Sequence, residues 1–155
     1  MEVAEQTITT NTSNIKVQKR DGRLEPLDID KIHFVVEEAC EGLTGVSSSQ
    51  IEINANIQFY DGITTKDIQH VLVKSANDLI SLENPNYQYA AARLLSYDVR
   101  KEAHGQYEYI PLLKLILRNI KLGVYDRTIV EKYSSSDIKK LNTWIKRDRD
   151  LDFTY

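Results

Sequence analysis

The chain has 155 residues, of which 41% are apolar and 28% charged, which suits one globular domain, or one domain and part of a second, with an apolar core. The formal net charge of −3 excludes a global basic field that would recruit nucleic acid, so we expect no nucleic-acid partner and an anionic ligand only where it is held locally. The single cysteine, Cys40, excludes a disulfide within the chain, and no apolar run approaches the ~20 residues of a membrane span.

Residues 1–14 are polar and rich in Thr, Asn and Ser without periodicity, which predicts a disordered N-terminal extension. Glu2 and Glu5 follow Met1 where an export signal would carry basic and then apolar residues. We therefore expect a cytoplasmic protein with no membrane contact.

Two short runs, residues 15–18 and 23–27, flank Asp21-Gly22. An Asp-Gly pair favours a hairpin with a two-residue loop, because both positions tolerate positive φ. From residue 29 the apolar positions follow the 3.6-residue period of a helix, which predicts a helix over 29–41 with Asp28 as N-cap and Gly42 as a left-handed stop.

Basic side chains gather at this hairpin and at the start of this helix. Lys19 and Arg20 adjoin the predicted turn, and Lys31 lies in the first helical turn. Such groups can converge on one anion, since backbone N–H groups and the helix dipole favour negative charge there. From these residues alone, an ordinary solvated hairpin with surface lysines is the favoured interpretation, because Asp-Gly hairpins are common and short motifs often match by chance.

Three further helices are predicted up to Gly105. Residues 47–50 carry the S-x-x-Q capping pattern of a short second helix, and Ile63 suggests a strand that could join the hairpin. A third helix follows Thr64-Thr65, and Asn84-Pro85 predicts the start of a fourth that Gly105 ends. Residues 15–105 therefore predict an α+β fold that is mostly α, with four helices and about three short strands.

The remaining residues predict more helix. Residues 109–122 form a dense apolar helix that needs cover on most sides. Residues 134–137 carry a capping pattern that opens a second, amphipathic helix, which ends in the charged run 146–150.

Most catalytic motifs are missing from the sequence. His33, His70 and His104 lack metal-ligand spacing, so we expect no intrinsic metal site. No Walker loop, G-x-G-x-x-G or G-x-S-x-G pattern occurs, and no acid–base pair is evident. We therefore assign no catalytic residue.

Three separated segments carry a resemblance to one family: VQKRDG (17–22), FYDGITTKDI (59–68) and PNYQYAAARL (85–94). In order and spacing they resemble the N-terminal ATP-cone of the large subunit of class I ribonucleotide reductase, with bacterial and bacteriophage members looking most similar. HGQY (104–107), GVYD (123–126) and RDRDLDFTY (147–155) extend the resemblance over nearly all of the chain after residue 14.

The resemblance implies a four-helix bundle capped by a three-stranded sheet, over residues 15–105. It implies binding of ATP as activator or dATP as inhibitor, with Mg accompanying the triphosphate, and control of deoxyribonucleotide synthesis for DNA replication. Residues 106–155 would be the opening helices of the next reductase domain.

Carried over position by position, the resemblance implies a nucleotide site of eleven residues. Lys19, Arg20, Thr65 and Lys101 would lie near the triphosphate. Lys31 and Gln69 would lie near the ribose, and Glu25 and Asp28 near the adenine edge. Val17, Ile32 and Phe59 would form the walls around the base.

Two departures from the family pattern affect these expectations. Gln69 stands where many cones have a histidine, and Phe34 where some have an arginine. The catalytic barrel, with its radical cysteine and reducing cysteine pair, has no counterpart here, so we expect no reductase activity from this chain alone.

Two alternatives to a reductase regulatory module remain. One is a nucleotide-sensing transcriptional repressor, since the chain also resembles the ATP-cone that one bacterial repressor family uses to read nucleotides. That family has a four-cysteine zinc ribbon before the cone, whereas residues 1–14 contain no cysteine. The other is a non-binding remnant that serves as an interaction surface. Under the first reading, the partners are the remaining large-subunit polypeptide and the reductase small subunit.

Overall fold

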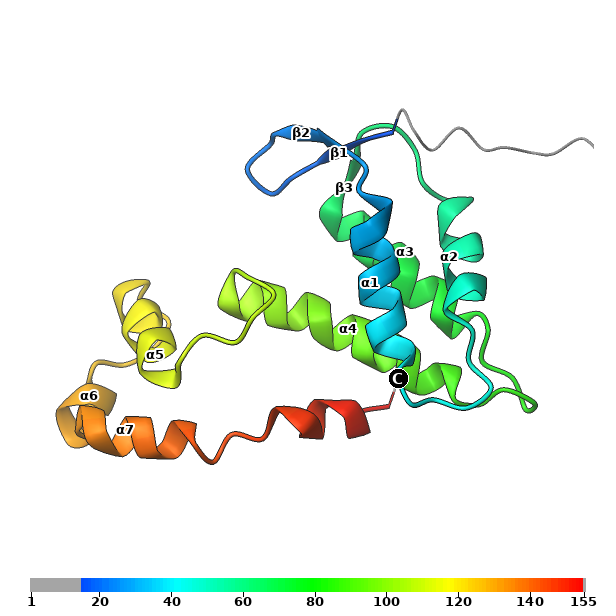
Figure 1. Cartoon of the computed structure of the whole chain (residues 1–155). Helices are drawn as coiled ribbons and strands as arrows, with labels where there is room; N and C mark the ends of the chain where they lie inside the picture. Colours follow the sequence, from blue (N-terminus) through cyan, green and yellow to red (C-terminus); the bar gives the residue numbers. More distant parts are fainter. Residues whose placement is uncertain (1–14, 155) are drawn as a thin grey trace, which may run out of the picture.

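The computed structural model describes residues 15–154, so the disorder expected for 1–14 lies outside the described residues. The N-terminal part holds strands β1 (Lys16–Gln18), β2 (Leu24–Pro26) and β3 (Ile63–Thr64), and helices α1 (Ile29–Cys40), α2 (Ser48–Asn56), α3 (Thr65–Asn77) and α4 (Tyr87–His104). The C-terminal part holds α5 (Leu112–Lys121), α6 (Thr128–Lys132), α7 (Ser135–Asn142) and the 3₁₀ helix η2 (Arg147–Asp152). The predicted mostly helical α+β class is confirmed (Figure 1).

The sheet has the order β2-β1-β3 and mixes two kinds of pairing. β1 and β2 form the predicted hairpin, with Val17 opposite Glu25, and β3 joins β1 in parallel, with Val17 opposite Ile63. The parallel pair is possible because α1 and α2 supply the crossover between β1 and β3.

The hairpin loop differs from the predicted two-residue turn. Lys19 N–H donates to the Arg23 carbonyl at 2.8 Å and Gly22 N–H to the Lys19 carbonyl at 2.9 Å, so the loop has three residues. A two-residue Asp-Gly turn needs positive φ at both residues. Gly22 has φ +84°, but Asp21 does not have a positive φ, since only glycines do among the described residues. This is the loop in which glycine takes the left-handed position of a bulge.

Helices α1 to α4 form a closed bundle in which α1 packs on α2 and α4, and α3 packs on α2 and α4. The apolar faces meet in one core, whose fully enclosed side chains include Val36, Ile51, Ile63, Leu72 and Leu94. The sheet lies over one end of the bundle, at the N-termini of α1 and α3 (Figure 1).

The helix caps test the predicted starts. Asp28 caps α1 as predicted, since its carboxylate accepts from Lys31 N–H at 3.2 Å, and Ser47 caps α2. The start predicted for the fourth helix at Asn84-Pro85 is wrong: α4 begins at Tyr87, with Asn86 at the cap position. The Asn86 amide instead donates to the Thr44 carbonyl at 2.9 Å, a tertiary contact that local sequence does not reveal.

The bounds of the C-terminal helices differ from the predicted ones. The apolar stretch 109–122 forms the shorter helix α5, which packs on α7, and α6 was not foreseen. Ser134 and Asp137 form the predicted cap of α7, but that helix ends at Asn142, before the charged run. No helix of the described residues is long and apolar enough to cross a membrane.

Arginines join the two parts of the chain. The Arg100 guanidinium on α4 lies 4.8 Å from the Tyr97 ring, 4.9 Å from Tyr107 and 4.8 Å from Tyr109. The Arg118 guanidinium on α5 donates to the carbonyls of Ala103 and His104 at the end of α4. These contacts fix the position of residues 106–110 against the bundle.

Candidate functional site

A cavity of about 760 Å³ opens between the hairpin, the first turns of α1, one face of α3 and the end of α4. It brings together side chains that are far apart in the sequence. Nine of the eleven residues expected for a nucleotide site line it: Val17, Lys19, Glu25, Asp28, Lys31, Ile32, Thr65, Gln69 and Lys101.

The inner wall of the cavity is apolar. Val17 from β1 and Ile32 from α1 are both buried, and Ile68 and Leu72 of α3 complete this wall. The last two were missed, although they follow Thr65 at the i+3 and i+7 positions of one helix face. That helical spacing was the signal that could have found them.

The end of the cavity near the hairpin is basic. The Lys19 ammonium lies 3.3 Å from Glu25 Oε2, and Lys101 on α4 lines the same end. Burial lowers the pKa of Lys101, and the positive charges of Arg20 and Lys19 lower it further, while Asp98 opposes the shift. Cations held this close together favour an anion between them.

Arg20 stands behind this basic end and is not a lining residue. One guanidinium nitrogen donates to the Lys101 carbonyl at 3.3 Å, and another lies 4.0 Å from Asp98 Oδ1. Asp98, only 7% exposed, also lies 3.6 Å from His70 Nε2. Sequence reasoning missed Asp98 and His70, because their pairing joins α3 to α4 and no local pattern marks it.

Two helix N-termini meet at the cavity. Asp28 caps α1, and its carboxylate also lies 2.8 Å from the Lys31 ammonium, which lowers the pKa of Asp28. Thr64 caps α3 through Asp67 N–H at 3.0 Å, which leaves Thr65 as the first helical residue. The N–H groups of these first turns add partial positive charge at the cavity.

Two side chains expected in the nucleotide site, Phe59 and Gln69, have other contacts in the structure. Phe59 does not line the cavity, because its ring, 9% exposed, packs in the core of the bundle. Gln69 lines the cavity but is 6% exposed, and its amide nitrogen donates to the Leu94 carbonyl at 2.8 Å. One of its two amide N–H donors is thus engaged with α4.

No group of three or more His, Cys, Asp or Glu side chains that could hold a metal ion occurs within residues 15–154. The cavity instead combines basic groups, an apolar wall and two carboxylates that each pair with a lysine, Glu25 with Lys19 and Asp28 with Lys31. This arrangement suits an amphipathic anion that carries a flat apolar part.

Comparison with known proteins agrees with this geometry. The model of the ATP cone domain matches residues 15–102, so the chain belongs to the ATP-cone family. Over 142 residues the chain is 46% identical to ribonucleoside-diphosphate reductase 1 subunit alpha of Escherichia coli, a match that covers 92% of this chain and 19% of that protein. The Haemophilus influenzae subunit alpha is 39% identical over 142 residues, 92% of this chain and 19% of that protein.

A third relative, the subunit alpha of Helicobacter pylori, is 40% identical over 141 residues, 91% of this chain and 18% of that protein. The chain therefore spans about a fifth of the length of the curated relatives it matches. The match extends past the cone into α5 to α7, so these helices also belong to the region of similarity.

Proposed function

We propose that the cavity binds ATP or dATP, and that the chain is the allosteric regulatory portion of a ribonucleoside-diphosphate reductase large subunit. The observation that carries this proposal is the convergence of Lys19 and Lys101 on one end of an apolar-walled cavity, with Arg20 behind them. A cavity of about 760 Å³ falls within the ordinary range for small-ligand sites.

In this proposal the triphosphate lies at the basic end, where Lys19, Arg20 and Lys101 meet the first turn of α3. Three cations and the helix N–H groups offset most of a charge of about −4, and a Mg ion carried by the phosphates supplies the rest. Thr65 adds a hydroxyl at this end.

The base then lies against the apolar wall that Val17, Ile32 and the α3 side chains form. Glu25 and Asp28 offer acceptors for an exocyclic amine, and Lys31 lies where the ribose would pass. Phe59 has no part in this pose, because it packs in the core.

Discrimination between ATP and dATP is expected to be weak. The two ligands differ by one 2′-hydroxyl, and one of the two amide N–H donors of Gln69 is already bonded to the Leu94 carbonyl, so the neutral amide offers that hydroxyl at most the other donor or its oxygen. One hydrogen bond gained or lost changes affinity by about 0.5–1.5 kcal/mol, a threefold to tenfold ratio. We expect both nucleotides to bind with less than tenfold difference and little inhibition by dATP.

We further propose that residues 15–105 are the cone and 106–155 the start of the next reductase domain. The partners are then the rest of the large-subunit polypeptide and the small subunit, in a cytoplasmic enzyme. We expect the purified chain to reduce no ribonucleotide, because radical reduction needs several cysteines and the chain has only Cys40.

Isothermal titration with ATP tests the proposed site. Lys101→Met should weaken binding by about tenfold or more, because it removes a desolvated cation from the phosphate end. Lys74→Met is the matched control on α3, since Lys74 is exposed and pairs with Asp78 at 2.7 Å, outside the cavity. The Lys74→Met variant should bind ATP with an affinity within twofold of that of the wild type.

Absence of ATP and dATP binding at millimolar concentration would contradict the proposal and leave the interaction-surface alternative. Titration of Gln69→His with both nucleotides tests the discrimination separately. A dATP preference above tenfold in the wild type, unchanged by the histidine, would show that position 69 does not set the ratio.

A further inference from the structure

A second concave surface lies outside the region that matches the ATP cone, between α5 and α7. It is a groove of about 620 Å³ that no other part of residues 15–154 fills. Its lining residues come from two helices: Pro111, Leu112, Leu113, Lys114, Leu117, Arg118 and Lys121 from α5 and the residue before it, and Lys139 and Asn142 from α7.

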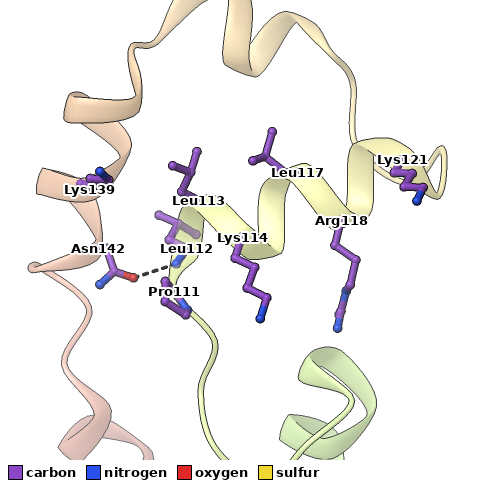
Figure 2. A pocket seen from close by; sticks show the side chains of 9 residues that line it. All are labelled: Pro111, Leu112, Leu113, Lys114, Leu117, Arg118, Lys121, Lys139 and Asn142. Atoms are coloured by element: carbon purple, nitrogen blue, oxygen red, sulfur yellow. Dashed lines mark hydrogen bonds between the residues drawn. The ribbon is translucent and has the colours of Figure 1, made fainter.

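The middle of the groove is apolar. Leu112, Leu113 and Leu117 project from α5 (Figure 2), and Leu117 is 51% exposed. Leu112 and Leu113 are half-buried, so Leu117 is the exposed member of this set. Apolar side chains gathered at one concave surface commonly mark an interaction site. This part of α5 is therefore built for contact with another apolar surface.

The rim of the groove is basic. The ammonium groups of Lys114, Lys121 and Lys139 make no ion pair with any carboxylate of the described residues. Arg118 is already committed to carbonyls at the end of α4. Three free cations therefore surround the leucines.

The charge of this region contrasts with that of the whole chain. Residues 109–146 contain eight lysines and arginines and three acidic residues, although the chain has a net charge of −3. Helix α5 contains no acidic residue at all. The local excess of positive charge favours an acidic partner.

The groove is formed before any partner arrives. Asn142 Oδ1 accepts from Leu112 N–H at 2.8 Å and ties α7 to the first turn of α5 (Figure 2). Ile116 of α5 and Ile138 of α7 are buried, and the two helices pack against each other. A preformed surface binds without a large ordering cost.

We propose that this groove docks an acidic amphipathic helix of a partner polypeptide. Its leucines would receive the apolar face of that helix, and its three lysines would pair with carboxylates on either side. With ten residues, α5 is about 15 Å long, which matches about three turns of a partner helix. This surface does not depend on nucleotide binding.

Other occupants fit the groove less well. A nucleic acid would leave the leucines against a polar backbone, and no aromatic side chain lines the groove for base stacking. A bilayer is flat, whereas this surface is concave between two helices. The proposal therefore commits to a helix.

Fluorescence anisotropy with the full chain tests the proposal. The probe is a labelled 14-residue helical peptide that carries leucines on one face and glutamates along both flanks. We expect saturable binding that weakens as salt rises from 50 to about 300 mM, because the rim pairs are exposed to screening. A scrambled peptide of identical composition should bind at least about tenfold more weakly.

Charge-reversal variants locate the binding. Lys121→Glu and Lys139→Glu should each weaken peptide binding by about tenfold, because each replaces an attraction to the peptide glutamates with a repulsion. Lys140→Glu is the matched control on α7: Lys140 is exposed and does not line the groove. It should change the affinity by less than twofold, and ATP binding should be unaffected by all three variants.

The proposal is overturned if the scrambled peptide binds equally well, or if Lys121→Glu and Lys140→Glu have the same effect. It is also overturned if light scattering shows a dimer that Leu117→Ser abolishes, which would assign the groove to a second copy. Preferential binding of a polyanion such as heparin, or of vesicles of anionic lipid, would assign it to another class of ligand. Circular dichroism of each variant verifies its folding.

Discussion

The N-terminal bundle, residues 15–105, and the C-terminal helices, residues 106–154, make opposite use of their apolar side chains. In the bundle four helices and a sheet enclose one core. In the C-terminal helices only Ile110, Ile116 and Ile138 are buried apolar residues among those described. Leu117, Leu122 and other large apolar side chains there remain exposed.

This difference teaches how the two parts divide their roles. The bundle closes its own core, so it can hold a cavity with fixed walls and concentrate charge at one end. The C-terminal helices do not close a core, so their apolar and basic surfaces are left for other polypeptide. The proposed ligand site and the proposed docking surface therefore have different structural requirements within one short chain.

The largest expected effect is on stability. Leu94→Ala should lower the free energy of unfolding by about 2–5 kcal/mol, because Leu94 is 0% exposed and its loss leaves a cavity in the bundle. Leu141→Ala, a matched change on α7 where the side chain is 47% exposed, should cost less than about 1 kcal/mol. Urea unfolding followed by circular dichroism measures both changes. Equal losses of unfolding free energy would contradict the contrast between a closed bundle core and open C-terminal helices.

A smaller effect is expected at the junction of the two parts. Arg100→Met should lower the free energy of unfolding by about 1–2 kcal/mol, because it removes a guanidinium that contacts three tyrosine rings. Arg127→Met on the exposed start of α6 is the control and should change little. No difference between the two variants would show that the aromatic cluster does not hold the parts together.

The smallest expected effect is the pH dependence of nucleotide binding. Burial is the chief cause that lowers the pKa of Lys101, so this side chain loses its proton at a pH below its ordinary pKa of 10.5. A bound triphosphate would raise that pKa again, because its negative charge stabilises the protonated ammonium. Affinity for ATP should therefore fall by about threefold to tenfold as the pH rises through this window. Titrations at pH 7.5 and at alkaline pH measure it.

Two controls belong to this pH prediction. In the ligand-free chain the contribution of Lys101 to stability should rise with pH, since the unfolded state binds the Lys101 proton more readily. Burial raises the pKa of Cys40 to about 11 and that of Tyr97 to about 12, so these two groups lower stability over an overlapping window, and only the difference from Lys101→Arg isolates the Lys101 contribution. Lys101→Arg should remove the pH dependence of affinity, because a guanidinium stays charged throughout. A pH dependence that survives in Lys101→Arg would assign it to another group.

The sequence predicted the elements of the bundle well, because its helices are amphipathic and its strands lie next to Asp-Gly signals. Periodicity placed Ile68 and Leu72 on the apolar face of the third helix, but they were not assigned to the nucleotide site. It failed where a tertiary contact decides the outcome. At the start of α4 the Asn86 amide donates to the Thr44 carbonyl and makes no cap hydrogen bond, and the Gln69 amide donates to the Leu94 carbonyl.

The resemblance to a family placed the cavity residues better than local reasoning could, since they come from β1, α1, α3 and α4. It did not place Phe59, because a side chain beside a loop can turn into the core or toward a ligand with the same sequence around it. The C-terminal helices were the hardest to foresee, because their packing depends on few buried contacts.

Hydrogen–deuterium exchange of the full chain with and without ATP tests the central claim most directly. The account predicts that ATP slows exchange at the hairpin, the first turns of α1 and α3, and the end of α4, and leaves α5 and α7 unchanged. Unchanged exchange throughout the bundle at saturating ATP, or protection confined to α5 and α7, would contradict the account.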